Sequence, residues 1–392
     1  MKHRNLIGAV ALGLIATGPL AHAQSGFFVT PSLGVTSIYD DNLFFSFDNE
    51  RQDVAARISP GLEVGYETPA TNILTRYTFD AEYYDKFTEL DSSNMRQFAD
   101  IEANHQISRR VQLEGDVHYT KTNTPADLAI ATGGPLQGLL LGRMEAQRIA
   151  VQPAVIVQLS ARSEARVEYG YTSDELPGTI QNTTNLFATE FTHQITAPTR
   201  LDVGYIYRQY DFERPATEAL PVAVANTQDS HTPWVGVRHD LSDRLQFTGR
   251  AGPRIYDDET RPYVQLSLRR THTGGDLILN YEHNETTLLG ELGRHEAETY
   301  SAAFTHTIGQ NFEIRITPAF GKLSQPNFAV DLYRAEMLAR YRLTPYLFLT
   351  ASLNMYYQEV EFASGAVDEV SRNIAMVGFQ LMLPRREARA RP

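Results

Sequence analysis

Apolar and polar side chains alternate along nearly the whole chain, and this period of two constrains the fold more than any other feature. In ILTRYTFDAEYYDKF, residues 73–87, the odd positions are mostly apolar and the even positions are mostly charged. Successive side chains of a β-strand point to opposite faces, so this pattern predicts a strand with one apolar and one polar face. The pattern recurs at 200–213, 311–322 and 345–361, and no segment shows the period of an amphipathic helix.

The chain begins with a short basic region, an apolar stretch and the small-residue sequence AHA. This order predicts a secretory signal peptide over residues 1–23, with the mature chain starting at Gln24. A membrane anchor is disfavoured because the apolar run is short and Gly18 and Pro19 interrupt it. We therefore expect an exported protein. Its net charge of -12 argues against nucleic acid as a partner.

Short turns alternate with long polar connections. Segments such as ISRRVQLEG (107–115) and LSDRLQFTG (241–249) carry a few turn-forming residues between two alternating strands, whereas 123–144 and 214–227 are much longer. Outer-membrane barrels have short periplasmic turns and long outer loops. We therefore predict an all-β fold, a single closed antiparallel transmembrane β-barrel over residues 24–383, with a basic periplasmic tail at 384–392. The count gives about 18 strands, or about 16 if the least regular segments are not strands.

Six prolines fall inside the expected strands. Proline cannot donate a ladder hydrogen bond, so it marks either a bulge or a strand that is shorter than the alternation indicates. The six are Pro31, Pro60, Pro153, Pro233, Pro253 and Pro318.

The stretch SIYDDNLFF, residues 37–45, places Asp40, Asp41 and Asn42 where the first strand meets its outer loop. Asp and Asn favour turns because their side chains bond the local backbone, and this is the interpretation we favour. Calcium binding is a less favoured alternative, since the oxygen ligands suit calcium but their spacing fits no known loop. Catalysis by these carboxylates is the least favoured.

The sequence PSLGVTSIYDDNLFF, followed by ARISPGLEVGYETPATNILTRYTFDAEYYDKF, resembles the beginning of the beta-barrel porin 2 family of outer-membrane proteins. Members are often encoded in exopolysaccharide gene clusters, so the resemblance implies a pore in the outer membrane of a Gram-negative bacterium, with polysaccharide as one candidate cargo. It implies no catalytic residues and no cofactor. We expect contact with outer-membrane lipid and lipopolysaccharide and insertion by the barrel assembly machinery. The oligomeric state stays open.

Charged residues on the polar faces are expected to line the lumen. The first nine strands carry mixed and mostly acidic charge there, and the later strands carry mostly arginine. One hypothesis is a basic stripe that guides an anionic solute or polymer. The alternative is that the arginines pair with acids and keep the interior wet and rigid. The arginines concerned are Arg238, Arg250, Arg254, Arg269, Arg315, Arg334, Arg340 and Arg372.

The loop at 123–144, NTPADLAIATGGPLQGLLLGRM, is long and unusually apolar. It could fold inward as a constriction or lie at the outer rim, and the candidate residues are Leu128, Leu136, Leu139, Leu140 and Leu141. A plugged, structural barrel that supports polysaccharide assembly without an open pore is therefore the alternative function. We do not expect an enzyme, because no nucleophile motif such as G-x-S-x-G is present.

Aromatic residues gather toward the ends of the expected strands. Amphipathic rings suit the headgroup level of a membrane, so we expect an aromatic girdle from Tyr39, Tyr83, Phe87, Tyr171, Tyr207, Tyr356 and Tyr357. A sugar-binding ladder of the inward tyrosines is a less favoured alternative, and its members would be Tyr84, Tyr210 and Tyr256.

Overall fold

The computed structural model is built almost entirely from β-strands. It describes residues 26–91, 96–124, 142–176, 181–214, 223–256, 259–287, 293–324, 328–383 and 386–387. The expected signal peptide, residues 1–23, and most of the expected C-terminal tail, residues 384–392, lie outside these residues. Within the described residues, the single helical element is the short 3-10 helix η1 (Thr88–Leu90), and no helix has the length and apolarity needed to cross a membrane.

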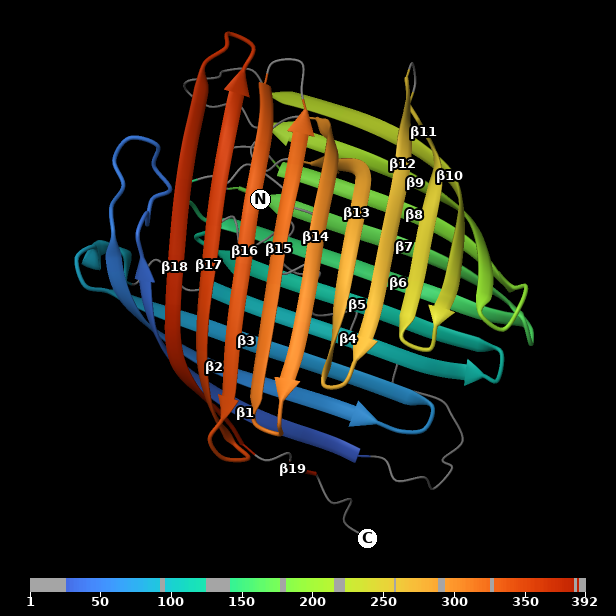
Figure 1. Cartoon of the computed structure of the whole chain (residues 1–392), viewed down its shortest axis with the longest axis horizontal. Helices are drawn as coiled ribbons and strands as arrows, with labels where there is room; N and C mark the ends of the chain where they lie inside the picture. Colours follow the sequence, from blue (N-terminus) through green and yellow to red (C-terminus); the bar gives the residue numbers. More distant parts are fainter. Residues whose placement is uncertain are drawn as a thin grey trace.

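Eighteen long strands follow one another in chain order, and each is antiparallel to the next (Figure 1). They are β1 (Gly26–Asp40), β2 (Asp53–Glu67), β3 (Thr71–Tyr84), β4 (Arg96–Ser108), β5 (Val111–Thr122), β6 (Ala146–Ser160), β7 (Ser163–Glu175), β8 (Gln181–Gln194), β9 (Thr199–Arg214), β10 (Val224–Ser242), β11 (Leu245–Ile255), β12 (Thr260–His272), β13 (Gly275–Thr287), β14 (Arg294–Ile308), β15 (Phe312–Ser324), β16 (Phe328–Arg342), β17 (Leu347–Phe362) and β18 (Val367–Met382).

The sheet closes on itself through its first and last long strands. β1 pairs with β18 from Ser32↔Met382 to Asp40↔Ile374, and with β2 along its other edge. A two-residue strand β19 (Arg386–Glu387) adds to β1 opposite Phe28 and Val29. The predicted closed antiparallel barrel and its count of eighteen are confirmed. The three least regular segments are the full strands β10, β12 and β14.

The outer face of the barrel is apolar. Side chains such as Val35, Val203 and Val377 are about half exposed, and their neighbours in sequence point into the barrel. On this face, rings of five consecutive strands from β13 to β17 touch one another in a chain, Tyr281–Tyr300–Phe320–Tyr333–Tyr357. Bands of outward aromatic rings are typical of membrane barrels, and the architecture is that of outer-membrane barrels.

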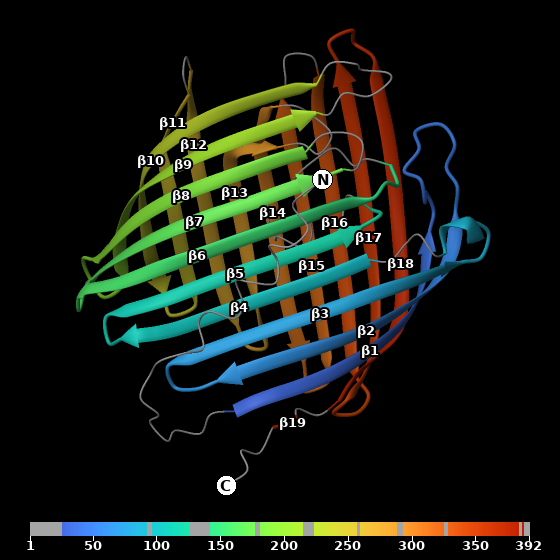
Figure 2. The same cartoon turned by 180° about the vertical axis from the view of Figure 1, so that it is seen from behind.

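The two ends of the barrel differ (Figure 2). At one end, the short-turn end, strands are joined by tight connections such as Arg109–Arg110 and Asp243–Arg244. At the other, the long-loop end, the connections are longer, and most buried side chains lie there. An apolar cluster of Leu323, Val330 and Leu332 on the inner wall at this end shows that the packed core sits inside one mouth of the barrel.

The six prolines neither shift the register nor shorten the strands, so both expectations for them are wrong. For example, the pairing of β2 with β3 is interrupted at Pro60. The pairs Ile58↔Ala81 and Gly61↔Thr78 on either side of it keep the same register. All six lie on the lipid-facing parity of strands that continue past them. The recorded register shifts lie instead at the short turns after β4, β6 and β10.

Candidate functional site in the barrel lumen

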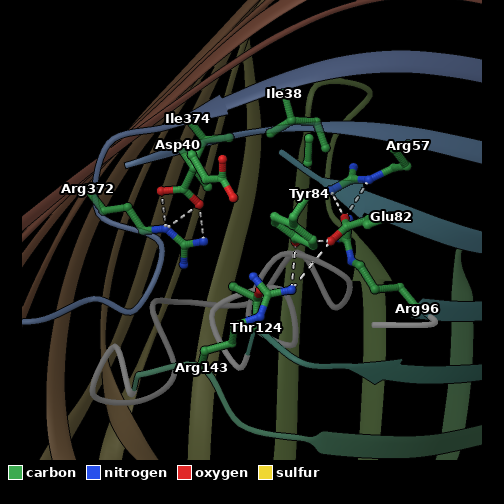
Figure 3. A pocket seen from close by; sticks show the side chains of 12 residues that line it. Ile38, Asp40, Arg57, Glu82, Tyr84, Arg96, Thr124, Arg143, Arg372 and Ile374 are labelled. Carbon is green, nitrogen blue, oxygen red and sulfur yellow. Dashed lines mark hydrogen bonds and ion pairs between the residues drawn. The ribbon is translucent and has the colours of Figure 1, made fainter. Parts of the chain in front are cut away.

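A pocket rich in ionic side chains lies on the inner wall at the long-loop end, between the first strands and β18 (Figure 3). Its centre is the carboxylate of Glu82, which accepts hydrogen bonds from Arg57 Nε at 2.8 Å and from the Tyr84 hydroxyl. Arg143, from the connection between β5 and β6, donates to the Tyr84 hydroxyl at 2.7 Å. Arg96 approaches the same carboxylate at 3.5 Å. Three guanidinium groups therefore surround one buried carboxylate.

The other side of this pocket is the seam between β1 and β18. Arg372 donates from Nη2 to Asp40 Oδ2 at 2.5 Å, and both side chains are buried. Asp41 accepts from the backbone and side-chain nitrogens of Asn373, each at 2.7 Å. These carboxylates are thus engaged by donors of the protein itself.

The favoured interpretation of the opening stretch is confirmed for Asn42. Its Oδ1 accepts from Ser46 N at 2.9 Å and its Nδ2 donates to Ser46 O at 3.0 Å, which closes the turn after β1. Its Nδ2 also donates to Ser371 O on β18 at 2.9 Å. In the described residues no group of three acidic or histidine side chains has the arrangement of a metal site.

A second feature narrows the lumen from the opposite wall. β13 pairs with β12 only as far as His283↔Val264, although it pairs with β14 up to Thr287↔Arg294. The upper end of β13 therefore leaves β12 and bends away from it, as Figure 1 shows. We call residues 284–287 and 294–297 the inward arm. It lies against the inner faces of β9, β10 and β11, as its side-chain contacts show.

Glu285 holds the inward arm to the wall. Its Oε1 accepts from Ser230 Oγ on β10 at 2.5 Å and from Arg208 Nη1 on β9 at 3.0 Å. The Glu285 side chain has no exposed surface. A buried carboxylate is stable only with such partners, so these contacts fix where the arm lies.

Arg254 on β11 makes the second set of contacts. It is completely buried, and it donates to Asn284 Oδ1 at 3.0 Å and to the carboxylate of Glu296. The hydroxyl of Tyr256 donates to Glu296 Oε1 at 2.9 Å. Both edges of the inward arm are thus tied to one wall strand.

The inward arm is not among the features predicted from the sequence. Glu285 and Glu296 occupy positions that alternation from Tyr281 and Tyr300 assigns to the lipid face, where a charged side chain is costly. Glu359 and Glu369 stand opposite one another at lipid-facing positions of β17 and β18 as well, so this arrangement alone does not distinguish the inward arm.

The eight arginines of the selectivity hypothesis all lie on the inner face, and most are paired with acids. Arg250 lies 3.0 Å from Glu190, Arg269 lies 3.3 Å from Asp276 and Arg334 lies 3.1 Å from Glu336. Arg254, Arg315 and Arg372 also have carboxylate partners. For Arg238 and Arg340, no ion pair is present in the described residues. The basic stripe stays a hypothesis, and these two residues are its strongest members.

An acidic wall faces the lumen on β4 to β7. Arg76 bridges Glu63 and Glu102, and Arg166 bridges Glu114 and Glu168. Each arginine therefore serves two carboxylates, and the wall retains an excess of negative charge. Its inward acids are Asp100, Glu102, Glu114, Asp116, Glu164 and Glu168.

Two further expectations concern the constriction loop and the aromatic residues. The candidate constriction residues Leu128, Leu136, Leu139, Leu140 and Leu141 lie outside the described residues. The inward tyrosines Tyr84, Tyr210 and Tyr256 are buried at the long-loop end, so they do not form an open ladder, and Tyr356 is buried rather than part of the girdle.

Comparisons with known proteins yield fold-level likeness only. No family model and no curated sequence matches the chain. Among solved structures, the siderophore receptor PirA from Pseudomonas aeruginosa has a TM-score of 0.44 at 9% identity, covering 91% of this chain and 80% of that one. OccK11 (OpdR) from the same organism has a TM-score of 0.45 at 10% identity, covering 93% and 100%. The ferric-catecholate import receptor Fiu from E. coli K12 has a TM-score of 0.45 at 10% identity, covering 92% and 82%. Values this low carry no inference about function, and the fold rests on the strand pairing itself.

Proposed function

We propose that the protein is an outer-membrane channel of a Gram-negative bacterium that passes a hydrophilic solute through its lumen, in keeping with the resemblance of its first strands to the beta-barrel porin 2 family. The observation that carries the proposal is the reversal of polarity across the wall, apolar outside and ionic or hydroxylic inside. A bilayer offers no hydrogen-bond partner to an open sheet edge, and the closed ladder leaves none. A barrel of about 18 strands is also wide enough to hold water.

An exopolysaccharide is the cargo that we propose. Inward Ser267, Asn280 and Ser301 stand side by side across β12, β13 and β14, and they form a row of neutral hydrogen-bonding groups. Most nearby arginines are neutralised by acids, so this part of the lumen suits a polyhydroxylated chain better than a strongly charged one.

An anionic solute is the second candidate, and the observation that favours it is the absence of an ion pair for Arg238 and Arg340 in the described residues. The plugged structural barrel is the remaining alternative, favoured by the inward arm. Conductance separates these possibilities.

The test is single-channel recording in planar bilayers with added neutral and uronic-acid oligosaccharides. A polysaccharide channel should conduct and should be blocked transiently by the neutral oligomers. Block by the acidic oligomers alone would favour the anionic solute. A complete lack of conductance would remove the channel and favour the plugged barrel.

A matched pair of variants tests the assignment of faces. Ser301→Phe places a ring in the lumen, whereas Ala302→Phe places it one residue further along, toward lipid. Only Ser301→Phe should lower conductance. An equal reduction from both variants would contradict the assigned faces.

A further inference from the structure

Four histidines lie in a row around the outer face, next to the short-turn end. They occupy equivalent positions in the segments NHQIS, THQIT, RHDLS and THTIG. In each segment the last residue, three positions after the histidine, lies at a short turn. We call His105, His193, His239 and His306 the histidine row. The same-face residues that follow them by two positions are about half exposed, and they are Ile107, Ile195, Leu241 and Ile308.

The Nδ1 atom of each row member has a defined partner. His105 bonds the Thr71 hydroxyl at 2.8 Å, and His193 bonds the Ser163 hydroxyl at 2.9 Å. His239 bonds the Thr199 hydroxyl at 2.9 Å in the same way. These three hydroxyl residues stand directly opposite the histidines on the neighbouring strands. In the fourth case, Nδ1 of His306 lies 2.9 Å from Nε2 of His272.

These contacts leave one nitrogen of each ring for an outside partner. A neutral imidazole carries a proton on one nitrogen, so a hydroxyl that donates to Nδ1 places the proton on Nε2. Nε2 is then a donor. Within the described residues, no hydrogen bond to Nε2 is present for any of the four. In the tautomer in which the hydroxyl donates, His105, His193 and His239 therefore present Nε2–H donors at the edge of the apolar band, where β16 carries the exposed ring of Tyr341. His306, whose Nδ1 lies against His272, also has its Nε2 available to an outside partner.

Arginines lie just beyond the row, in the short turns. Arg109 and Arg110 follow β4, Arg162 follows β6 and Arg244 follows β10. All four are exposed, and none forms an ion pair in the described residues. Most lumen arginines, in contrast, have carboxylate partners. A chain of net charge -12 thus exposes unpaired positive charge at this rim, and Asp243 is the one acid in these three turns.

We propose that the histidine row and the turn arginines bind the phosphate and glycerol-ester oxygens of phospholipids in the periplasmic leaflet. The proposal rests on the outer-membrane placement proposed above, which puts the short turns on the periplasmic side. Guanidinium groups bind phosphate through charge-assisted hydrogen bonds. The imidazole Nε2–H groups, which lie further from the turns and closer to the centre of the bilayer, donate to the ester oxygens. The site fixes the depth of the barrel in the membrane.

The experiment counts lipids on the purified protein in detergent by native mass spectrometry, with phosphatidylglycerol as the probe. The principal variant carries His→Phe at all four row positions, which keeps an aromatic ring at each. We expect its binding of phosphatidylglycerol to weaken roughly tenfold, the effect of one lost net hydrogen bond. Diacylglycerol, which lacks the phosphate, should bind the wild-type protein more weakly than phosphatidylglycerol.

His231→Phe is the matched control. This histidine also lies on the outer face and also bonds through Nδ1, to the Tyr205 hydroxyl at 2.6 Å, but it is far from the short turns. The control should bind lipid as the wild type does. Unchanged lipid binding in the fourfold variant, or equal binding of diacylglycerol, would overturn the proposal.

A second variant set, Arg→Gln at the four turn positions, covers the case in which the histidine variant does not fold. It should also weaken phosphatidylglycerol binding, and no change would overturn the arginine part. Conductance measured on the same variants keeps the two proposals apart. Conductance without histidine-dependent lipid binding would refute only the lipid site. Histidine-dependent lipid binding without conductance would refute only the proposed channel.

Discussion

Arg372 on β18 and Asp40 on β1 form a buried ion pair that joins the last and first long strands of the barrel. Arg372 Nε lies 3.1 Å from both oxygens of the Asp40 carboxylate, and Nη2 lies 2.5 Å from one of them. The two residues are 332 positions apart in the chain. The pair therefore lies at the closure of the sheet, where the two paired strands come from opposite ends of the chain.

We expect Arg372→Met to lower the free energy of unfolding by about 3–5 kcal/mol, because it leaves a buried carboxylate without its cation. Denaturant unfolding in detergent measures this. Arg315→Met is the control, since Arg315 and Glu313 are partly exposed and 3.6 Å apart. Such a pair contributes at most about 1 kcal/mol. Equal losses in the two variants would show that the seam pair has no special role.

Release of the inward arm should change conductance. Glu285→Gln removes the charge that Arg208 and Ser230 hold. We expect a larger mean single-channel conductance and more frequent fluctuations, because the arm loses its main attachment. Glu313→Gln, which removes a lumen carboxylate remote from the arm, is the control. A conductance equal to wild type in Glu285→Gln would mean that the arm does not limit the flow.

A cross-link gives the opposite test. The chain has no cysteine, so Ser230→Cys with Glu285→Cys introduces the only two thiols. A short thiol-reactive linker between them should hold the arm against the wall and suppress the fluctuations, and a linker cleaved by reductant should restore them. Fluctuations that persist in the linked protein would place their source elsewhere.

The barrel could be predicted from the sequence because its rule is local. Alternation at Ile73 or Ile314 reports which side of the wall a side chain faces, and lipid on one side enforces it over every strand. The same rule placed all eight lumen arginines on the inner face. Closure followed from the absence of any partner for a free edge.

The candidate site could be predicted only in part, because its contacts join residues far apart in the chain. Alternation places Arg250 inward, but it does not reveal that Glu190 on another strand neutralises it. The inward arm breaks the rule itself, since Glu285 lies at a lipid-facing position and yet faces a wall of the lumen. The histidine row could not be predicted, because only the strand register shows that His105, His193 and His239 each stand opposite a hydroxyl residue.

Ion preference should respond to Arg238 and Arg340, which form no ion pair in the described residues. Arg238→Glu combined with Arg340→Glu reverses two charges of the lumen. We expect permeability to shift toward cations by roughly twofold or more, since pore-wall charges select by their field. Reversal potentials under a salt gradient measure the shift. Arg109→Glu with Arg110→Glu makes the same charge change outside the lumen, and an equal shift there would refute a lumen stripe.

The only tryptophan reports on the packing of the inner wall. Trp234 is buried, the Arg250 guanidinium lies 4.4 Å from its ring centroid, and a Cβ added at Gly204 would lie 2.4 Å from its ring. Gly204→Ala should therefore displace the ring, shift its fluorescence to longer wavelength and lower stability by about 1–3 kcal/mol. Gly115→Ala is the control, because nothing lies within 4 Å of its added Cβ. An unshifted spectrum in Gly204→Ala would contradict the close packing of Trp234 on β9.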